Sequence, residues 1–325
     1  MIKTAIVGAG FMGGTHIVCH KLSSFVQPVA VVEVREDLAR EKLKNFELDL
    51  PVYTDMEEMI KNEHPDLVDI ATPTFTHKEL AVKAMELGCN VLCEKPMALS
   101  VADCREMIEA SRRTGKKLMV AHVVRFMAPY MYLKHTVDTG RLGKLLRLNM
   151  ARNSSTPNWS WENWMMDEAK SGGEIVDLSV HDIDFVNYLL GRPDNISCVH
   201  YTMKDETEFS SVNFTYENTS VSIEGGWYSA PIPFKAGFTA YFEKGLIEFN
   251  GTGIIENGNN IEITDETEAI LIDGKPYAKD DGYRKEIEYF ADCIENGREP
   301  EIVLPESSAD TIALCLEILG KAENI

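Results

Sequence analysis

Hydrophobic positions in the first third of the chain fall in short apolar runs that alternate with amphipathic segments. Continuous apolar runs of this kind are typical of strands buried on both faces of a parallel sheet. The predicted strands cover residues 4–7, 29–34, 52–53, 67–71, 90–93 and 117–121, and the predicted helices cover residues 12–22, 36–45, 56–62, 77–87 and 101–114. Asp55, Thr76 and Ser100 are predicted to cap three of these helices. The alternation predicts an α/β domain with a doubly wound parallel sheet.

The pattern changes after residue 126, where this alternation stops. Residues 196–272 form short alternating strands between turn residues, which is typical of an antiparallel sheet. The other predicted elements are a helix over 129–139, a strand over 145–154, a polar loop over 156–170, and helices over 173–189, 283–296 and 305–322. We expect two domains, residues 1–123 and 124–325, with the last helices able to pack back on the first domain. The cleft between the domains is the expected ligand site.

A glycine-rich turn follows the first predicted strand. Gly8, Gly10 and Gly13 form the pattern Gly-x-Gly-x-x-Gly, which also includes Phe11 and Met12. In dinucleotide-binding turns the first glycine permits a tight bend, the second admits the pyrophosphate, and the third lets the helix pack on the strand. The helix N-terminus then faces the phosphates. A purely structural turn is the alternative, but the flanking strand and helix favour a nicotinamide dinucleotide.

Glu33 lies near the end of the second predicted strand and bears on the choice of cofactor. A carboxylate at this place accepts hydrogen bonds from the adenosine ribose hydroxyls and repels a 2′-phosphate. Arg35, two residues further on, would partly offset that repulsion. The sequence therefore predicts NAD in preference to NADP.

Composition narrows the range of partners. The 325 residues carry 32 basic and 52 acidic side chains, a net charge of −20, with 44% hydrophobic content and a pI near 4.8. This acidity argues against nucleic acid and anionic membranes, which need clustered Lys and Arg. Seven scattered cysteines do not suggest a disulfide framework. Neither a signal peptide nor an apolar stretch long enough to span a membrane is evident, so a cytoplasmic location is expected.

Lys95 is the first candidate for chemistry. It follows an apolar strand and is expected at the sheet edge where ligands of open α/β sheets bind. The turn at residues 72–74 is expected at the same edge. Pro96 restricts Lys95 to an extended conformation. An ammonium held there can hydrogen-bond a substrate oxygen and stabilise a developing alkoxide, and the adjacent Glu94 can hydrogen-bond the nicotinamide ribose. The alternative is a solvated surface lysine.

Asp177 and His181 are the second candidate. They are four residues apart on a predicted helix and therefore share one face. The carboxylate can orient the imidazole, which can then take the proton of a substrate hydroxyl. The alternative is an exposed pair that only supports the helix. Asp182 and Asp184 would suit a metal, but His and Cys ligands nearby are missing, so no metal is predicted.

Five motifs stand in order along the whole chain. They are Gly8-x-Gly10-x-x-Gly13-x-x-His16, Asp69-Ile70-Ala71-Thr72-Pro73-Thr74 with His77, Glu94-Lys95-Pro96, Arg125-Phe126-x-x-Pro129, and Gly172-Gly173-x-x-x-Asp177-x-x-x-His181-Asp182-Ile183-Asp184. Together they resemble the Gfo/Idh/MocA oxidoreductases, which include glucose–fructose oxidoreductase and inositol 2-dehydrogenase. One departure is Glu174, since a third glycine commonly follows the glycine pair.

The resemblance implies an N-terminal Rossmann domain and a C-terminal α+β domain whose open, mainly antiparallel sheet often forms the interface of a homodimer or homotetramer. It also implies a catalytic set of Lys95, Asp177 and His181, with His181 as general base. The other implied positions are Thr72, Pro73, Thr74 and His77 along the cofactor, Glu94 near the nicotinamide ribose, and Arg125 near the nicotinamide or substrate.

The resulting hypothesis is an NAD-dependent dehydrogenase that oxidises a secondary alcohol of a small polyol, such as an inositol, a sugar or a sugar derivative. Asn153, Trp161 and Trp164 can supply polar and apolar walls for a sugar ring, although core packing is an alternative for both tryptophans. Tyr283 can also reach the cleft. Two other functions stay open: an NAD-dependent glycosidase that oxidises the sugar transiently, and a non-catalytic sugar or NAD sensor.

Overall fold

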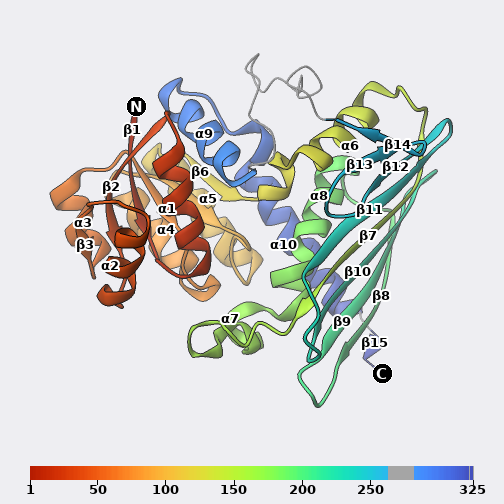
Figure 1. Cartoon of the computed structure of the whole chain (residues 1–325), viewed down its shortest axis with the longest axis horizontal. Helices are drawn as coiled ribbons and strands as arrows, with labels where there is room; N and C mark the ends of the chain where they lie inside the picture. Colours follow the sequence, from red (N-terminus) through yellow and green to blue (C-terminus); the bar gives the residue numbers. More distant parts are fainter. Residues whose placement is uncertain (263–281, 322, 325) are drawn as a thin grey trace. The chain divides into compact units, whose positions relative to one another are not determined.

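The computed structural model describes residues 1–262, 282–321 and 323–324. It divides into two compact units, one formed by Met1–Val123 with Asp281–Asp310 and the other by Val124–Asp280 with Thr311–Ile325 (Figure 1). The predicted strand pattern over residues 263–272 and the predicted helix end at Ala322 lie outside the described residues.

A six-stranded parallel sheet forms the centre of the first unit. Its strands are β1 (Ile2–Val7), β2 (Val26–Val32), β3 (Val52–Tyr53), β4 (Leu67–Ile70), β5 (Asn90–Glu94) and β6 (Leu118–Ala121). They are ordered β3-β2-β1-β4-β5-β6, with every neighbouring pair parallel. This is the strand order of the dinucleotide-binding fold, with the topological switch at β1 and β4. The predicted doubly wound sheet is confirmed.

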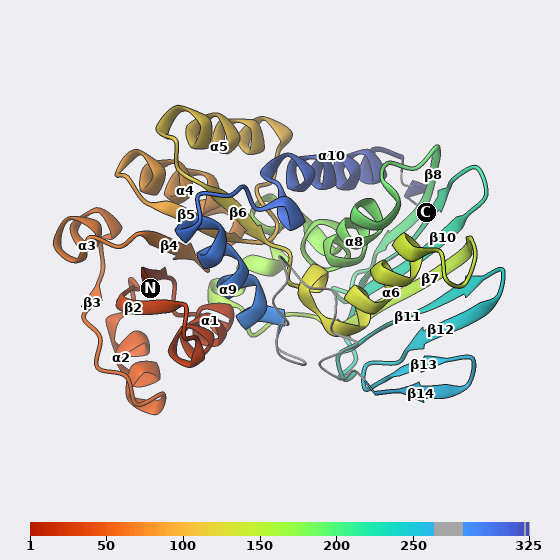
Figure 2. The same ribbon diagram turned by 90° about the horizontal axis from the view of Figure 1, so that it is seen from above.

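Helices cover both faces of this sheet (Figure 2). One face carries α1 (Phe11–Leu22), α2 (Glu36–Asn45) and α9 (Gly282–Glu295), and the other carries α3 (Met56–Glu63), α4 (His77–Glu86) and α5 (Val101–Thr114). On the first face, a buried cluster joins the helices to the strands through Ile6, Ile17, Val31 and Leu43. Helix α9 comes from the end of the sequence and packs against α1.

Two of the three predicted helix caps are confirmed. Asp55 accepts a hydrogen bond from Glu58 N at 2.7 Å, and Ser100 accepts one from Asp103 N at 3.0 Å, so both cap their helices. The prediction for Thr76 was wrong in its chemistry. A short 3-10 turn η1 (Thr74–Thr76) precedes α4, and within it the Thr76 hydroxyl donates to Pro73 O instead of capping the helix.

A mixed sheet, with nine strands among the described residues, forms the centre of the second unit. Its order is β14 (Asn259–Ile261), β13 (Ile254–Glu256), β12 (Gly245–Phe249), β11 (Lys235–Phe242), β7 (Leu145–Ser155), β10 (Ser220–Tyr228), β9 (Glu208–Thr215), β8 (Asn195–Thr202) and β15 (Glu323–Asn324). The β7–β10 and β8–β15 pairs are parallel and the others antiparallel. The prediction of a mainly antiparallel sheet is confirmed.

One face of this sheet carries the helices of the second unit (Figure 1). The longer ones are α6 (Ala128–Thr139), α8 (Val180–Leu190) and the part of α10 (Pro305–Lys321) that follows Asp310. Helix α8 contacts β7 and α6. The Thr311 hydroxyl joins α10 to α8, because it donates a hydrogen bond to Asp184 Oδ1 and accepts one from Asn187 Nδ2. Among the described residues of the second unit, no helix lies on the opposite face of this sheet, so within that unit the sheet is open as expected.

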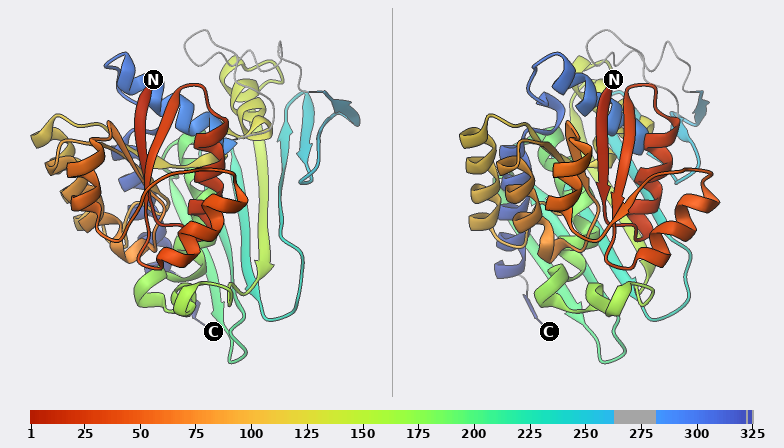
Figure 3. Two further views of the ribbon diagram at one scale, coloured as in Figure 1. Left: turned by 60° about the vertical axis from the view of Figure 1, so that its left-hand side comes forward. Right: turned by 90° about the vertical axis from the view of Figure 1, so that its left-hand side faces the viewer.

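The segment between β7 and α8 is more ordered than the sequence predicts. The expected loop contains the 3-10 turn η3 (Trp161–Met166) and the short helix α7 (Glu168–Ser171), drawn light green in Figure 3. The predicted single helix over 173–189 is divided into a π turn η4 (Ile175–Ser179) and α8. Further short 3-10 turns are η2 (Val123–Phe126) and η5 (Glu301–Val303).

Among the described residues, no helix has both the length and the apolar character needed to cross a membrane. The seven cysteines all lie within the described ranges, are buried, and form no disulfide there.

Candidate active site and cofactor site

The glycine turn between β1 and α1 has the geometry that a dinucleotide needs. Gly8 has a φ of +97°, and a Cβ on it would lie 2.5 Å from Ala71 O. A Cβ on Gly13 would lie 2.0 Å from Gly8 O, whereas one on Gly10 would meet nothing within 4 Å. The outer glycines are therefore needed for close packing, and the middle one leaves open space where a phosphate can approach the backbone.

Glu33 follows β2 and lies against the glycine turn. Its Oε2 accepts a hydrogen bond from Ala9 N at 2.8 Å, while Oε1 accepts from Arg35 N at 3.0 Å and Arg35 Nε at 3.2 Å. A polar depression of about 540 Å³ adjoins it, lined by residues 34–37. These positions suit the adenosine end of a dinucleotide, and the carboxylate also braces the turn that would hold the phosphates.

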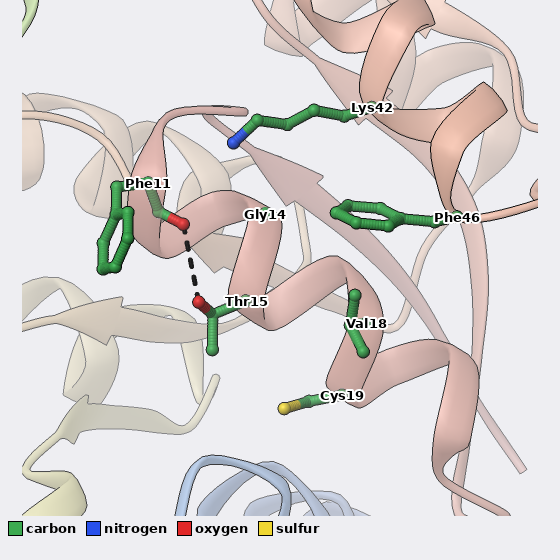
Figure 4. Close-up of a pocket in the computed structure, with 7 residues that line it drawn as sticks. All are labelled: Phe11, Gly14, Thr15, Val18, Cys19, Lys42 and Phe46. Carbon is green, nitrogen blue, oxygen red and sulfur yellow. Dashed lines mark hydrogen bonds between the residues drawn. The ribbon is translucent and has the colours of Figure 1, made fainter.

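Lys42 is a residue of this site that the sequence did not predict. It lies in α2, and its Nζ donates a hydrogen bond to the carbonyl oxygen of Gly10 in the glycine turn. Burial lowers the pKa of Lys42, although the nearby Glu33 acts to raise it. Together with Phe11 and Phe46, Lys42 lines an open depression of about 340 Å³ beside α1 (Figure 4). Its position depends on the packing of α2 against α1, for which the local sequence carries no signal.

His77 joins the two turns at the carboxyl ends of β4 and β5. Its buried ring lies between two backbone carbonyls, with Nδ1 2.9 Å from Pro96 O and Nε2 2.9 Å from Thr72 O. Burial lowers the pKa of His77. Thr74 is also buried, while Thr72 and Pro73 are partly exposed at the strand edge. The structure thus gives His77 a bracing contact, and its place along the cofactor stays a prediction.

A buried polar chain runs behind Lys95. His16 of α1 has Nδ1 2.8 Å from Asp69 Oδ2 and Nε2 3.1 Å from Glu94 Oε1. Glu94 Oε2 in turn accepts a hydrogen bond from Lys95 N at 2.9 Å. Because each ring nitrogen of His16 faces a carboxylate, both must donate, and the ring is held as an imidazolium. The chain connects the glycine-turn helix to the backbone of Lys95.

The charges in this chain support one another. Burial alone would lower the pKa of His16, but the contacts with Asp69 and Glu94 outweigh it and raise the pKa well above its ordinary value. Burial alone would raise the pKa of Asp69, but His16 and His20 outweigh it and hold that pKa far below its ordinary value. His20 Nε2 lies 2.7 Å from Asp69 Oδ2. His16 and Asp69 stood in the sequence motifs, but their contacts were not predicted.

Lys95 lies directly after β5, as predicted, and its side chain is partly exposed. The Lys95–Pro96 peptide bond is cis. Glu94 is buried and faces His16, so the structure places Glu94 and Lys95 together at the carboxyl edge of the sheet. This is the edge at which ligands of open α/β sheets bind.

Asp177 and His181 lie in the second unit, on either side of the change from π turn to α-helix. Asp177 is 5% exposed within η4, and His181 is half-buried in the first turn of α8. Since a π turn contains more residues than an α turn, the simple four-residue spacing assumed from the sequence does not describe this segment. The assumption of a continuous α-helix was wrong, while the catalytic roles of both residues stay predictions.

The other two carboxylates of the motif hold buried arginines. Asp182 accepts two hydrogen bonds from Arg152 Nε and Nη2, each of 2.9 Å. Asp184 accepts from Arg125 Nε at 2.8 Å and Nη2 at 2.6 Å. Paired, bidentate contacts of this kind satisfy the charge of a buried carboxylate. Arg125, which is also 4.6 Å from the ring centre of Tyr188, fixes η2 to α8, and its role beside a nicotinamide or substrate stays a prediction.

The proposed substrate-contacting residues fall in both units. Asn153 lies partly exposed on β7, and Trp161, 40% exposed, lies with Trp164 on η3. The exposure of Trp161 does not fit the core-packing alternative. Tyr283 lies in α9 of the first unit, where its ring centre is 6.2 Å from that of His16. Contacts of these four residues with a substrate stay predictions.

Sequence comparison places this chain in a family. An oxidoreductase family with an NAD-binding Rossmann fold, GFO/IDH/MocA, matches residues 2–122, and the GFO/IDH/MocA C-terminal domain matches residues 130–248. The chain belongs to this family, and the resemblance inferred from its motifs is confirmed.

Named relatives include a 2,7-anhydro-N-acetylneuraminate hydratase of Mediterraneibacter gnavus, 35% identical over 194 residues, which cover 59% of this chain and 50% of the relative. An inositol 2-dehydrogenase of Salmonella typhimurium is 29% identical over 196 residues, covering 59% of this chain and 55% of the relative. The chain thus spans about half the length of these relatives. A levoglucosan dehydrogenase structure in complex with NADH and levoglucosan shares the fold, with a TM-score of 0.82 and 20% identity over 99% of this chain and 97% of the other.

Proposed function

We propose that this chain is an NAD-dependent dehydrogenase that oxidises a secondary alcohol of a small polyol, an inositol, a sugar or a sugar derivative. The observation that carries the proposal is the polar chain that ties the glycine-turn helix to Lys95, because it joins a dinucleotide turn to a cationic group at the ligand-binding edge of one sheet. Relatives named as inositol 2-dehydrogenase and D-glucoside 3-dehydrogenase support the substrate class.

The three predicted catalytic side chains divide the work of an alcohol oxidation. His181 accepts the hydroxyl proton as general base, and Asp177 orients its ring and stabilises the imidazolium that forms. The Lys95 ammonium donates a hydrogen bond to the same oxygen and stabilises the developing alkoxide. When bound, NAD supplies the acceptor for the hydride that leaves the carbinol carbon, and the product is a ketone.

Glu33 supports NAD over NADP. Its carboxylate lies at the end of β2 beside the glycine turn, where ribose hydroxyls can donate to it and where a 2′-phosphate would meet a negative charge. Arg35 already donates two hydrogen bonds to this carboxylate, so its charge is directed at Glu33. We therefore propose NAD as the working cofactor.

The test is a screen of inositols, aldoses and their acids with NAD and NADP, followed by the absorbance of the reduced cofactor. With a substrate in hand, His181→Ala is expected to lower kcat by about 10²–10⁴-fold, the usual contribution of a general base, while the Kd of NADH stays unchanged. His135→Ala, which removes an exposed histidine from α6, is the matched control. A His181→Ala variant that loses NADH affinity in place of turnover would contradict the base role.

A redox-neutral reaction is the second candidate, and the hydratase relative favours it. A hydratase produces no net oxidation, and neither does a glycosidase that oxidises its sugar only transiently. The same side chains serve either reaction, so the assay separates them: consumption of an anhydrosugar or a nitrophenyl glycoside without accumulating NADH would identify this class. A non-catalytic sensor would show neither turnover nor NAD reduction with any polyol.

The resemblance also leads us to propose a homodimer or homotetramer formed through the open sheet of the second unit. Light scattering of the purified protein measures the mass directly, and a monomer at micromolar concentration would contradict the proposal.

A further inference from the structure

Glu174 stands where the family resemblance leads one to expect a third glycine. Gly172 and Gly173 have φ values of +81° and +73°, which favour glycine. Glu174 has φ −56° and ψ −44°, which are ordinary right-handed helical values. The third position therefore does not require glycine, and its side chain is available for another role.

The Glu174 carboxyl is completely buried between the π turn and the sheet. Its Oε1 accepts a hydrogen bond from the Ser179 hydroxyl, and its Oε2 accepts one from the Ser210 hydroxyl of β9 at 2.8 Å. Ser210 pairs with Gly225 of β10, where a Cβ would lie only 2.1 Å from Glu174 Oε1. Gly225 thus leaves the space that the carboxyl fills.

These contacts span the segment that carries the proposed catalytic pair. Glu174 directly precedes the π turn Ile175–Ser179, and its side chain is hydrogen-bonded to Ser179, the last residue of the turn. This hydrogen bond therefore spans the whole turn. Asp177 lies in the middle of the turn, and His181 follows it by four residues. π turns are often found at functional sites, where they change the direction of a side chain. A bond across this turn fixes where Asp177 is presented relative to His181.

The backbone of Glu174 is held by the same strand. Glu174 N donates a hydrogen bond to Glu208 Oε1 of β9 at 2.9 Å, and His200 Nε2 of β8 lies 2.9 Å from that oxygen. The start of the π turn is therefore attached to the sheet by both its backbone and its side chain.

We propose that Glu174 is a positioning residue for Asp177 and His181, because its buried carboxyl fastens the π turn to Ser179 and to Ser210 of β9. The inference rests on the proposed function, since it assigns Glu174 to the presentation of the proposed base. It concerns a residue in which this chain departs from the expected glycine pattern.

The charge state of this carboxyl gives the proposal a distinctive test. Burial raises the pKa of Glu174 to about 7; Glu208 adds to the rise, and the two serine hydroxyls and His200 act against it. The other titratable groups that face it are Cys198 of β8, Tyr228 of β10 and Cys315 of α10. Ionisation puts a buried negative charge beside Glu208, and this cost outweighs the gain from the two serine hydrogen bonds, so the segment is expected to open more readily above neutral pH.

Hydrogen exchange tests the fastening without any substrate. Peptides covering residues 174–181 are compared in the wild type, Glu174→Ala, Glu174→Gln and Glu217→Ala, the last removing an exposed carboxylate between β9 and β10. We expect Glu174→Ala to speed exchange at least about tenfold and Glu217→Ala to leave it unchanged. Glu174→Gln keeps a hydrogen-bonding group that stays neutral at every pH. The exchange rate of the wild type divided by that of Glu174→Gln should therefore rise between about pH 6 and about pH 8.

His200 is present in both proteins of this ratio, so only the part of its raised pKa that comes from the charge of Glu174 differs between them. Unchanged protection in a folded Glu174→Ala protein overturns the proposal, and so does a ratio that is constant with pH. If Glu174→Ala fails to fold, the pH dependence of the ratio of wild-type to Glu174→Gln exchange rates tests the proposal.

If Glu174 positions the catalytic pair, its removal should change kcat without changing the affinity for the cofactor. With a polyol that the chain oxidises, Glu174→Ala is expected to lower kcat at least about tenfold, since small displacements of catalytic groups are costly. The Kd of NADH should stay unchanged, and Glu174→Gln should keep wild-type kcat. A loss of NADH affinity that matches the loss of kcat overturns the positioning role. If no polyol is oxidised, the proposed function fails, whereas the exchange result still decides whether Glu174 fastens the turn.

Discussion

Glu174→Gln is expected to make the protein more stable than the wild type above neutral pH. The Glu174 carboxyl is fully buried, and its burial, together with the charge of Glu208, raises its pKa from 4.5 to about 7. The folded state therefore binds this proton more tightly than the unfolded state. The stability that this adds is fully present below pH 4.5 and is lost as the pH rises to about 7.

The size of the effect follows from the two pKa values. One pH unit between them is worth about 1.4 kcal/mol, so the wild type loses about 3 kcal/mol of unfolding free energy across the span from 4.5 to about 7. Glutamine has no proton to lose and keeps both serine contacts within reach. The difference between variant and wild type should therefore grow by about 2–3 kcal/mol between about pH 5 and about pH 8.

Urea unfolding at both pH values measures this difference, with tryptophan fluorescence as the signal because Trp227 is buried in β10, close to Gly225. Titrating groups that do not face Glu174 are common to both proteins and cancel in the comparison. Glu217→Gln, at an exposed site, is the control and should show no growing difference. Parallel stability curves for wild type and Glu174→Gln would show that folding does not raise the pKa of the buried carboxyl, and would contradict the prediction.

Three further predictions concern the first unit. Asp69→Asn leaves His16 and His20 facing an uncharged side chain, so urea unfolding near neutral pH should show a loss of about 3–5 kcal/mol. The stability that Asp69 adds is present above its ordinary pKa and is lost as the pH falls through its lowered pKa. The difference in unfolding free energy between wild type and Asp69→Asn should therefore shrink in acid, and a constant difference would contradict this prediction. Gly13→Ala places a Cβ 2.0 Å from a backbone oxygen and should weaken NADH binding at least about tenfold in a fluorescence titration; unchanged affinity would show that the turn does not hold the cofactor. Glu33→Ala should reduce the preference for NAD over NADP about tenfold in kcat/KM, and an unchanged preference would place discrimination elsewhere.

Much of the first unit could be predicted from local sequence. Six apolar runs became the six strands, and the helix caps at Asp55 and Ser100 were predicted correctly because a cap depends on residues three positions apart. The glycine turn was equally local, since its sterics involve β1, α1 and the adjacent end of β4. The same local reasoning missed the chemistry at Thr76, where two hydroxyls and a proline carbonyl compete.

The π turn after Gly173 could not be predicted from local sequence. The segment after Gly173 has a uniform helical pattern, yet it forms a π turn, and at its start Glu174 is held by Ser210 and Glu208 of a strand more than thirty residues away. The pattern of apolar residues contains no information about that partner.

The order of strands and helices, the glycine turn and the family could all be predicted from the sequence alone. Those features depend on periodicity and on residues close together in the chain. The three-dimensional structure was needed to show that His16 bridges Asp69 and Glu94 behind Lys95, and that Asp182 and Asp184 hold arginines. A buried charge must be paired in space, and which residue pairs with it depends on how the whole unit packs.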